Sequence, residues 1–132
     1  MNTSSFLLLR LAIGASMLGH GLVRLPKLHT FSGWMVGTFA KSMLPQVLVT
    51  PFSYILPIAE FIIGLLLVTG LFTKQALIGG SLVMIMLVFG ACMIEDWGIM
   101  PSQLIHVAVF TLLLQFISSN TGAIDKLFIQ QK

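Results

Sequence analysis

The chain has 132 residues, of which 57% are hydrophobic and 8% are charged, and its mean hydropathy is +1.02. Soluble globular domains carry about 25% charged residues, so the composition excludes that class and indicates an integral membrane protein. The formal net charge of +3 comes from basic residues scattered singly along the chain, so it does not indicate nucleic-acid binding. The single cysteine, Cys92, excludes an intramolecular disulfide and a thiolate metal cage.

Four apolar stretches approach the roughly 20 residues that a helix needs to cross the hydrocarbon core of a bilayer. They lie at 6–25, 52–72, 76–94 and 100–118, and turn-forming residues separate them. A chain in lipid must satisfy its own backbone hydrogen bonds, so we expect each stretch to be a helix. The sequence therefore predicts an all-α integral membrane four-helix bundle over residues 1–132, in one domain, in contact with the lipid bilayer and with both termini on one side.

The connection between the first two spans, residues 26–50, is longer than a turn requires. Apolar residues recur in it at three- and four-residue spacing, with polar residues between them: Leu28, Phe31, Met35, Phe39 and Met43. This pattern predicts a short amphipathic segment at the membrane interface. A cap that packs on the bundle has the same pattern, so the sequence leaves both interpretations open.

Ionisable residues interrupt three of the four spans. At about 1.5 Å per residue, His20, Glu60 and His106 all fall about 18 to 21 Å from the face that carries the termini. Arg24 lies one turn beyond His20 on the same helical face. An isolated charge at the centre of a bilayer costs about 2.5 kcal/mol or more. We therefore expect these four side chains to converge inside the bundle.

A second polar level is predicted nearer the termini. By the same count Arg10 lies at a depth of about 6 Å and Gln115 at about 8 Å. Near the first cluster, Pro57 is expected to bend the second span and to free a backbone carbonyl. We interpret several glycines as sites of close helix approach in lipid: Gly14, Gly21, Gly64, Gly79, Gly80 and Gly90.

The first two spans also carry a recognisable pattern. The first reads Arg10-Leu11, Gly14, His20-Gly21 and Arg24-Leu25, and the second reads Pro57, Glu60, Gly64-Leu65-Leu66-Leu67 and Gly70-Leu71-Phe72-Thr73. The pattern resembles the DoxX/DoxD family of small four-helix bacterial membrane proteins. That family often has lysine where this chain has Arg24, which keeps the charge but changes the hydrogen-bond geometry.

The resemblance implies a multi-pass protein of the bacterial inner membrane. Basic residues are nearly balanced between the two sides, with Lys74, Lys126 and Lys132 on the side of the termini, which we expect to be cytoplasmic. Some relatives look like subunits of a thiosulfate:quinone oxidoreductase, and others are membrane partners of soluble enzymes in thiol homeostasis. The resemblance thus implies a quinone-linked redox subunit or its membrane anchor, with a soluble or membrane redox protein as partner. It assigns no catalytic residue, and it leaves open whether the chain is itself an enzyme or forms a homo-oligomer.

Three interpretations of the cluster of His20, Arg24, Glu60 and His106 remain open. In the first it is a structural polar network that fixes the packing of the helices, in a scaffold that recruits partner proteins. In the second a histidine donates a hydrogen bond to a quinone carbonyl, and Glu60 exchanges protons. In the third the histidines and the carboxylate hold a metal or haem. No local spacing motif supports the third interpretation, so we assign no metal ligands. A small transporter is disfavoured, because one four-helix bundle leaves little room for alternating access.

Overall fold

The computed structural model describes residues 1–125, and all regular secondary structure in that range is helical. The helices are α1 (Thr3–Arg24), α2 (Leu28–Phe39), α3 (Gln46–Thr69), α4 (Thr73–Met93) and α5 (Met100–Gln115), with short 3₁₀ turns at Leu25–Lys27 and Ile117–Ser119. Three helical stretches are long and apolar enough to cross a bilayer: Thr3–Phe39, Gln46–Thr69 and Thr73–Met93. The prediction of an all-α membrane bundle is confirmed.

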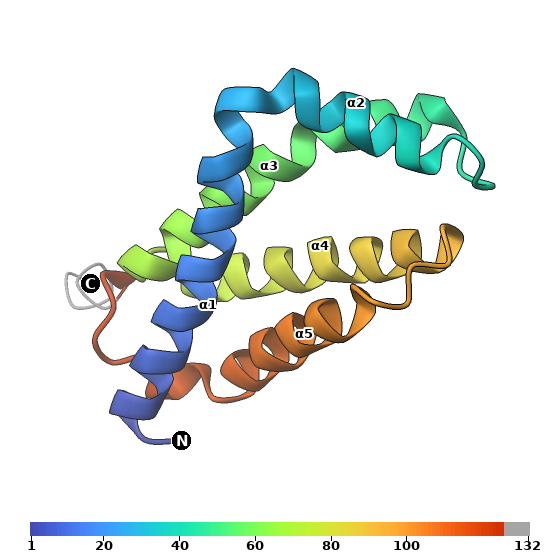
Figure 1. The fold of residues 1–132 in the computed structure, drawn as a ribbon. Coiled ribbons are helices and arrows are strands. Elements are labelled where there is room, and N and C mark those ends of the chain that lie inside the picture. Colours follow the sequence, from blue (N-terminus) through green and yellow to red (C-terminus); the bar gives the residue numbers. More distant parts are fainter. Residues whose placement is uncertain (126–132) are drawn as a thin grey trace.

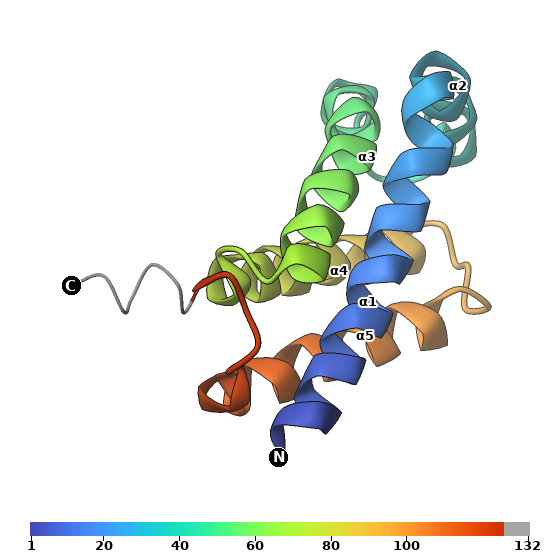
Figure 2. The same cartoon turned by 90° about the vertical axis from the view of Figure 1, so that its left-hand side faces the viewer.

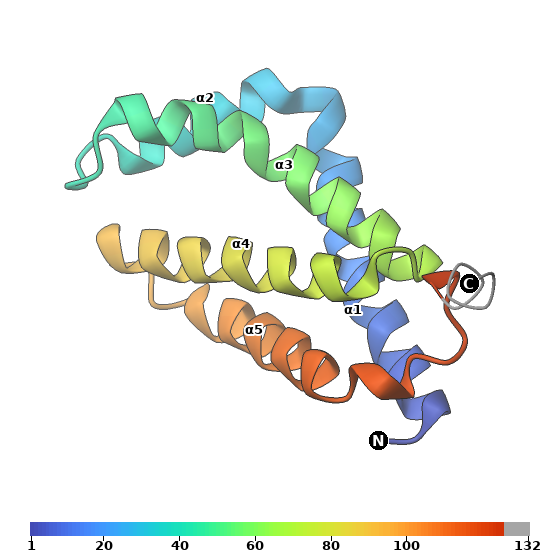
Figure 3. The same cartoon turned by 180° about the vertical axis from the view of Figure 1, so that it is seen from behind.

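The helices form two layers. Helices α1 and α3 pack side by side, and beyond the turn at Leu25–Lys27 the chain continues as α2 along the first half of α3 (Figures 1 and 2). We call α2 together with residues 46–56 of α3 the arm. Helices α4 and α5 form a hairpin, and the arm extends over α4 (Figure 3). The arm and the hairpin are thus the two walls between which a site can form.

Helix α3 begins six residues before the predicted start at residue 52, at Gln46. Pro51 is the sixth residue of this helix, so the helix continues through it although its missing N–H leaves the carbonyl of Val47 without an intrahelical partner. At the other end of the chain, α5 stops at Gln115 instead of residue 118. Its 16 residues span about 24 Å, so it is shorter than the other membrane helices.

The predicted amphipathic segment is helix α2, and it packs on the bundle as a cap would. Its residues Ser32 and Met35 are buried, whereas Trp34 is 63% exposed. The hydroxyl of Ser53 donates its single hydrogen to the carbonyl of Thr50 (2.6 Å). In the bond between the hydroxyls of Ser32 and Ser53 (2.6 Å), which joins α2 to α3, Ser32 is therefore the donor. Pro57 has no N–H for the carbonyl of Ser53, and α3 bends along its length (Figure 3). Polar groups inside the arm therefore join α2 to α3.

The close packing of α1 against α3 depends on glycine. A Cβ atom on Gly21 would collide with the backbone of Phe61, and one on Gly64 would collide with the backbone of Leu18. A Cβ on Gly80 would meet the ring of Phe110, where α4 packs on α5. The prediction of close helix approach is confirmed at these positions. Gly79 has only ordinary van der Waals contact with Ile63.

Both ends of the described chain lie at the same end of the bundle, as predicted (Figure 1). The hydroxyl of Ser119 donates to the carbonyl of Met1 (2.7 Å), and the hydroxyls of Thr121 and Thr3 are 3.1 Å apart. Lys126 and Lys132, which entered the prediction of orientation, lie outside the described residues.

Candidate functional site

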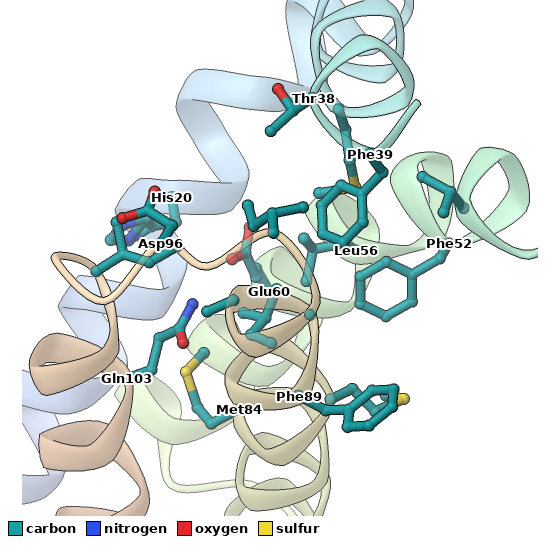
Figure 4. Close-up of a pocket in the computed structure, with 18 of the residues that line it drawn as sticks. His20, Thr38, Phe39, Phe52, Leu56, Glu60, Met84, Phe89, Asp96 and Gln103 are labelled. Carbon is teal, nitrogen blue, oxygen red and sulfur yellow. The ribbon is translucent and has the colours of Figure 1, made fainter. Parts of the chain in front are cut away.

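A cavity of about 900 Å³ lies between the arm, the hairpin of α4 and α5, and the C-terminal half of α1 (Figure 4). Its volume falls in the range of about 300 to 1,000 Å³ that is typical of small-molecule sites. All five helices contribute to its lining, which is mostly apolar and aromatic. The four predicted site residues, His20, Arg24, Glu60 and His106, all line this one cavity.

An ion pair lies at the polar end of the cavity. Nη1 of Arg24 donates to both carboxylate oxygens of Glu60, at 2.7 and 2.6 Å. The Glu60 side chain is 3% exposed and that of Arg24 is 27% exposed. The guanidinium of Arg24 also lies over the ring of Phe31, 4.7 Å from its centroid, which adds a cation–π contact. Glu60 is therefore buried as one partner of a charge pair between α1 and α3.

Backbone carbonyls set the tautomers of both histidines in the cavity. Nδ1 of His20 lies 2.9 Å from the carbonyl oxygen of Ser16, and Nδ1 of His106 lies 2.8 Å from that of Ser102. A carbonyl only accepts, so each Nδ1 carries the hydrogen and each Nε2 is an acceptor in the neutral ring. Nε2 of His106 accepts from the hydroxyl of Ser16 (3.0 Å). Among the hydrogen bonds of residues 1–125, none engages Nε2 of His20, which leaves this atom for a ligand.

Three residues of this site were not identified from the sequence: Ser16, Asp96 and Gln103. Ser16 contacts both histidines, and it lies four residues before His20 on the same face of α1. Gln103 extends from α5 toward the side of the cavity that holds Glu60 and His20 (Figure 4). Asp96, in the loop between α4 and α5, is exposed and also lines the cavity. Gln103 could have been identified from the sequence, because it lies three residues before His106 and therefore on the same face of the helix.

The second polar level differs from the prediction. Arg10 is 2% exposed, and its Nη1 donates to Oδ1 of Asn120 (2.9 Å), whose amide donates to Oγ1 of Thr73 (3.0 Å). Gln115, the predicted neighbour of Arg10, is exposed. The reason is that α5 ends at Gln115, and the turn at Ile117–Ser119 brings Asn120 under α1 instead.

The metal interpretation finds no ligand set within residues 1–125. No group of three His, Cys, Asp or Glu side chains in that range is placed to hold a metal ion. Nε2 of His106 is engaged by Ser16, so the two histidines do not present a free pair of ring nitrogens to a haem iron either.

Comparison with known proteins gave one match. The DoxX family model matches residues 5–93, which include His20, Arg24 and Glu60 but not the α5 residues of the cavity. No curated protein and no solved structure gave a significant match.

Proposed function

The chain belongs to the DoxX family of membrane proteins, and from this premise we propose that it binds a membrane quinone as a redox subunit or as the membrane anchor of one. The observation that carries the proposal is the cavity, which joins an apolar, aromatic lining to a small group of polar side chains at one end. This is the general pattern of a site for an apolar ligand with a polar head.

The polar residues fit a quinone head group by their chemistry. A bound quinone would supply two carbonyl oxygens as hydrogen-bond acceptors and would take up two protons with two electrons. Arg24 and the amide of Gln103 are donors on two sides of the cavity, and the free Nε2 of His20 binds or releases a proton. The Glu60 carboxylate, held by Arg24, is the second group that can exchange a proton with the ligand.

Electrons must reach this site from a partner. The only cysteine of the chain, Cys92, cannot form a dithiol–disulfide couple on its own. We therefore place the electron donor on a soluble or membrane redox protein, in sulfur or thiol metabolism as the family resemblance implies. On this proposal the protein lies in the bacterial inner membrane, with its termini in the cytoplasm.

Quinone binding in detergent tests the site directly. We expect His20→Ala and Glu60→Gln each to weaken binding by about tenfold, because each removes or alters a hydrogen bond worth about 1.5 kcal/mol. Binding can be followed by quenching of Trp34, which lines the cavity, in a Trp97→Phe background that leaves a single tryptophan. Thr69→Ala is the matched control, because the Thr69 hydroxyl bonds only to carbonyls of its own helix, those of Leu65 and Leu66.

A non-catalytic scaffold is the second candidate. It is favoured by two internal pairs, Arg24 with Glu60 and Ser16 with His106, which satisfy each other without any ligand. If His20→Ala and Glu60→Gln bind quinone as the control does but unfold at lower temperature, the cluster is structural and the scaffold reading holds.

A further inference from the structure

Beyond its polar end, the cavity continues as an apolar channel between the arm and α4. Aromatic side chains form much of this part: Phe39 and Phe52 belong to the arm, and Phe89 belongs to α4 (Figure 4). Leu48 and Ile85 extend the same lining on the two walls. No charged side chain lines the cavity between these residues. The ion pair, the two histidines and Asp96 are gathered at the polar end, where His20 and Asp96 are themselves exposed.

The channel reaches the outer surface of the helices. Leu48, Ile85 and Phe89 line the cavity, yet they are 59%, 54% and 56% exposed. The outward faces of α3 and α4 are apolar around them, with Ile55 and Leu82 also more than half exposed. An apolar face of a membrane helix meets lipid chains. One passage therefore connects the lipid-facing surface with Arg24 and Glu60.

We propose that this channel holds the hydrocarbon tail of the ligand, so that the site selects a long-tailed quinone that enters sideways from the bilayer. The inference rests on the proposed function and adds the ligand class and its route. A head group alone fits the polar end but leaves the channel without contacts. A tailed quinone fills both parts and keeps the far end of its tail among lipid chains.

The width of the channel matters more than its hydrophobicity. A tail that moves from lipid into the channel is apolar in both places, so its binding depends on van der Waals contact rather than on release of water. Gly90 of α4 lines the narrow part, where a Cβ atom would lie 3.2 Å from Cζ of Phe39 in the arm. A larger side chain at position 90 would fill the space between α4 and α2.

The test compares a quinone that carries a decyl chain with the same head group without a chain. Binding to wild type and to Gly90→Leu is measured by Trp34 quenching, in the Trp97→Phe background and in one detergent. Partition of each quinone into the micelle is the same for both proteins, so it cancels from the ratio of affinities. We expect Gly90→Leu to bind the decyl quinone at least about fivefold more weakly and the bare head group within about twofold of wild type, because only the tail loses packing contacts.

A second pair of variants keeps the test decisive if Gly90→Leu does not fold. Phe89→Ala removes one aromatic side chain from the lining of the channel. Leu82→Ala truncates an equally exposed residue two turns away on the same face of α4, outside the cavity. Phe89→Ala should weaken binding of the decyl quinone alone, and Leu82→Ala should weaken neither ligand. Equal effects on both ligands, or no effect on either, would overturn the tail channel while the head-group site stands. Failure of wild type to bind either ligand would instead overturn the proposed function.

Discussion

Arg24→Ala should lower the stability of the protein by about 3 to 5 kcal/mol, because removing one partner of a buried ion pair leaves the other charge without compensation. The charge left behind is that of Glu60, whose side chain is 3% exposed and accepts both of its charged hydrogen bonds from Arg24. Glu60→Ala should cost less, because Arg24 is 27% exposed and keeps its contact with the ring of Phe31. The measurement is the thermal unfolding midpoint of each variant in one detergent.

A double variant is the control for this prediction. Arg24→Leu with Glu60→Leu removes both charges at once, and apolar residues of similar volume often replace a buried pair at little cost. Its stability should therefore lie much closer to wild type than that of Arg24→Ala. If both single variants unfold within about 0.5 kcal/mol of wild type, the pair behaves as an exposed one and this account of its burial is wrong.

The same double variant separates the two candidate functions. A quinone site loses its charged groups even when the fold is kept, so binding should fall while the unfolding temperature does not. If the cluster is purely structural, any quinone binding should fall only when the unfolding temperature falls, so the double variant should keep both. Measurement of both quantities on one protein distinguishes a site from a scaffold.

Counting residues from the membrane faces was enough to group His20, Arg24, Glu60 and His106, and all four line one cavity. A buried charge in lipid must find a partner, and helix geometry fixes depth at about 1.5 Å per residue, so a count along each span places these side chains at similar depths. The hydrogen-bond partners within the group did not follow from depth. Which nitrogen of His20 stays free depends on the carbonyl of Ser16, which no pattern in the sequence reports.

The cavity itself could not be predicted, because it depends on how the arm lies over α4. The direction of α2 follows from the turn at Leu25–Lys27 and the bend of α3 near Pro57, and neither has a periodic signal. Asn120 was missed as the partner of Arg10 for a similar reason. The chain after α5 is irregular, and the bond of Asn120 with Arg10 joins residues 110 positions apart in the sequence, which no local pattern reports.

Gly64→Ala should also destabilise the protein, because the new Cβ would collide with backbone atoms of Leu18, which cannot move aside like the end of a side chain. We expect a loss of about 1 to 3 kcal/mol, the usual cost of forcing extra volume into a packed contact. Gly79→Ala is the matched control one helix away. A Cβ atom at position 79 would meet only Ile63, at ordinary contact distance, and alanine is a better helix former than glycine. The stability of the Gly79→Ala variant should therefore equal that of wild type or exceed it by up to about 1 kcal/mol.

The effect of Gly64→Ala should extend to the site. Gly64 lies one turn after Glu60, and Gly21 lies three residues before Arg24, so the contact of α1 with α3 sets the distance between the two charges. Separation of the helices would lengthen the bond from Arg24 to Glu60 and change the polar end of the cavity. Quinone binding by Gly64→Ala should therefore weaken at temperatures where the variant is still folded, whereas Gly79→Ala should bind as wild type does. Normal stability and binding in Gly64→Ala would show that α1 and α3 are not held this closely, and that the charge pair does not depend on glycine at their contact.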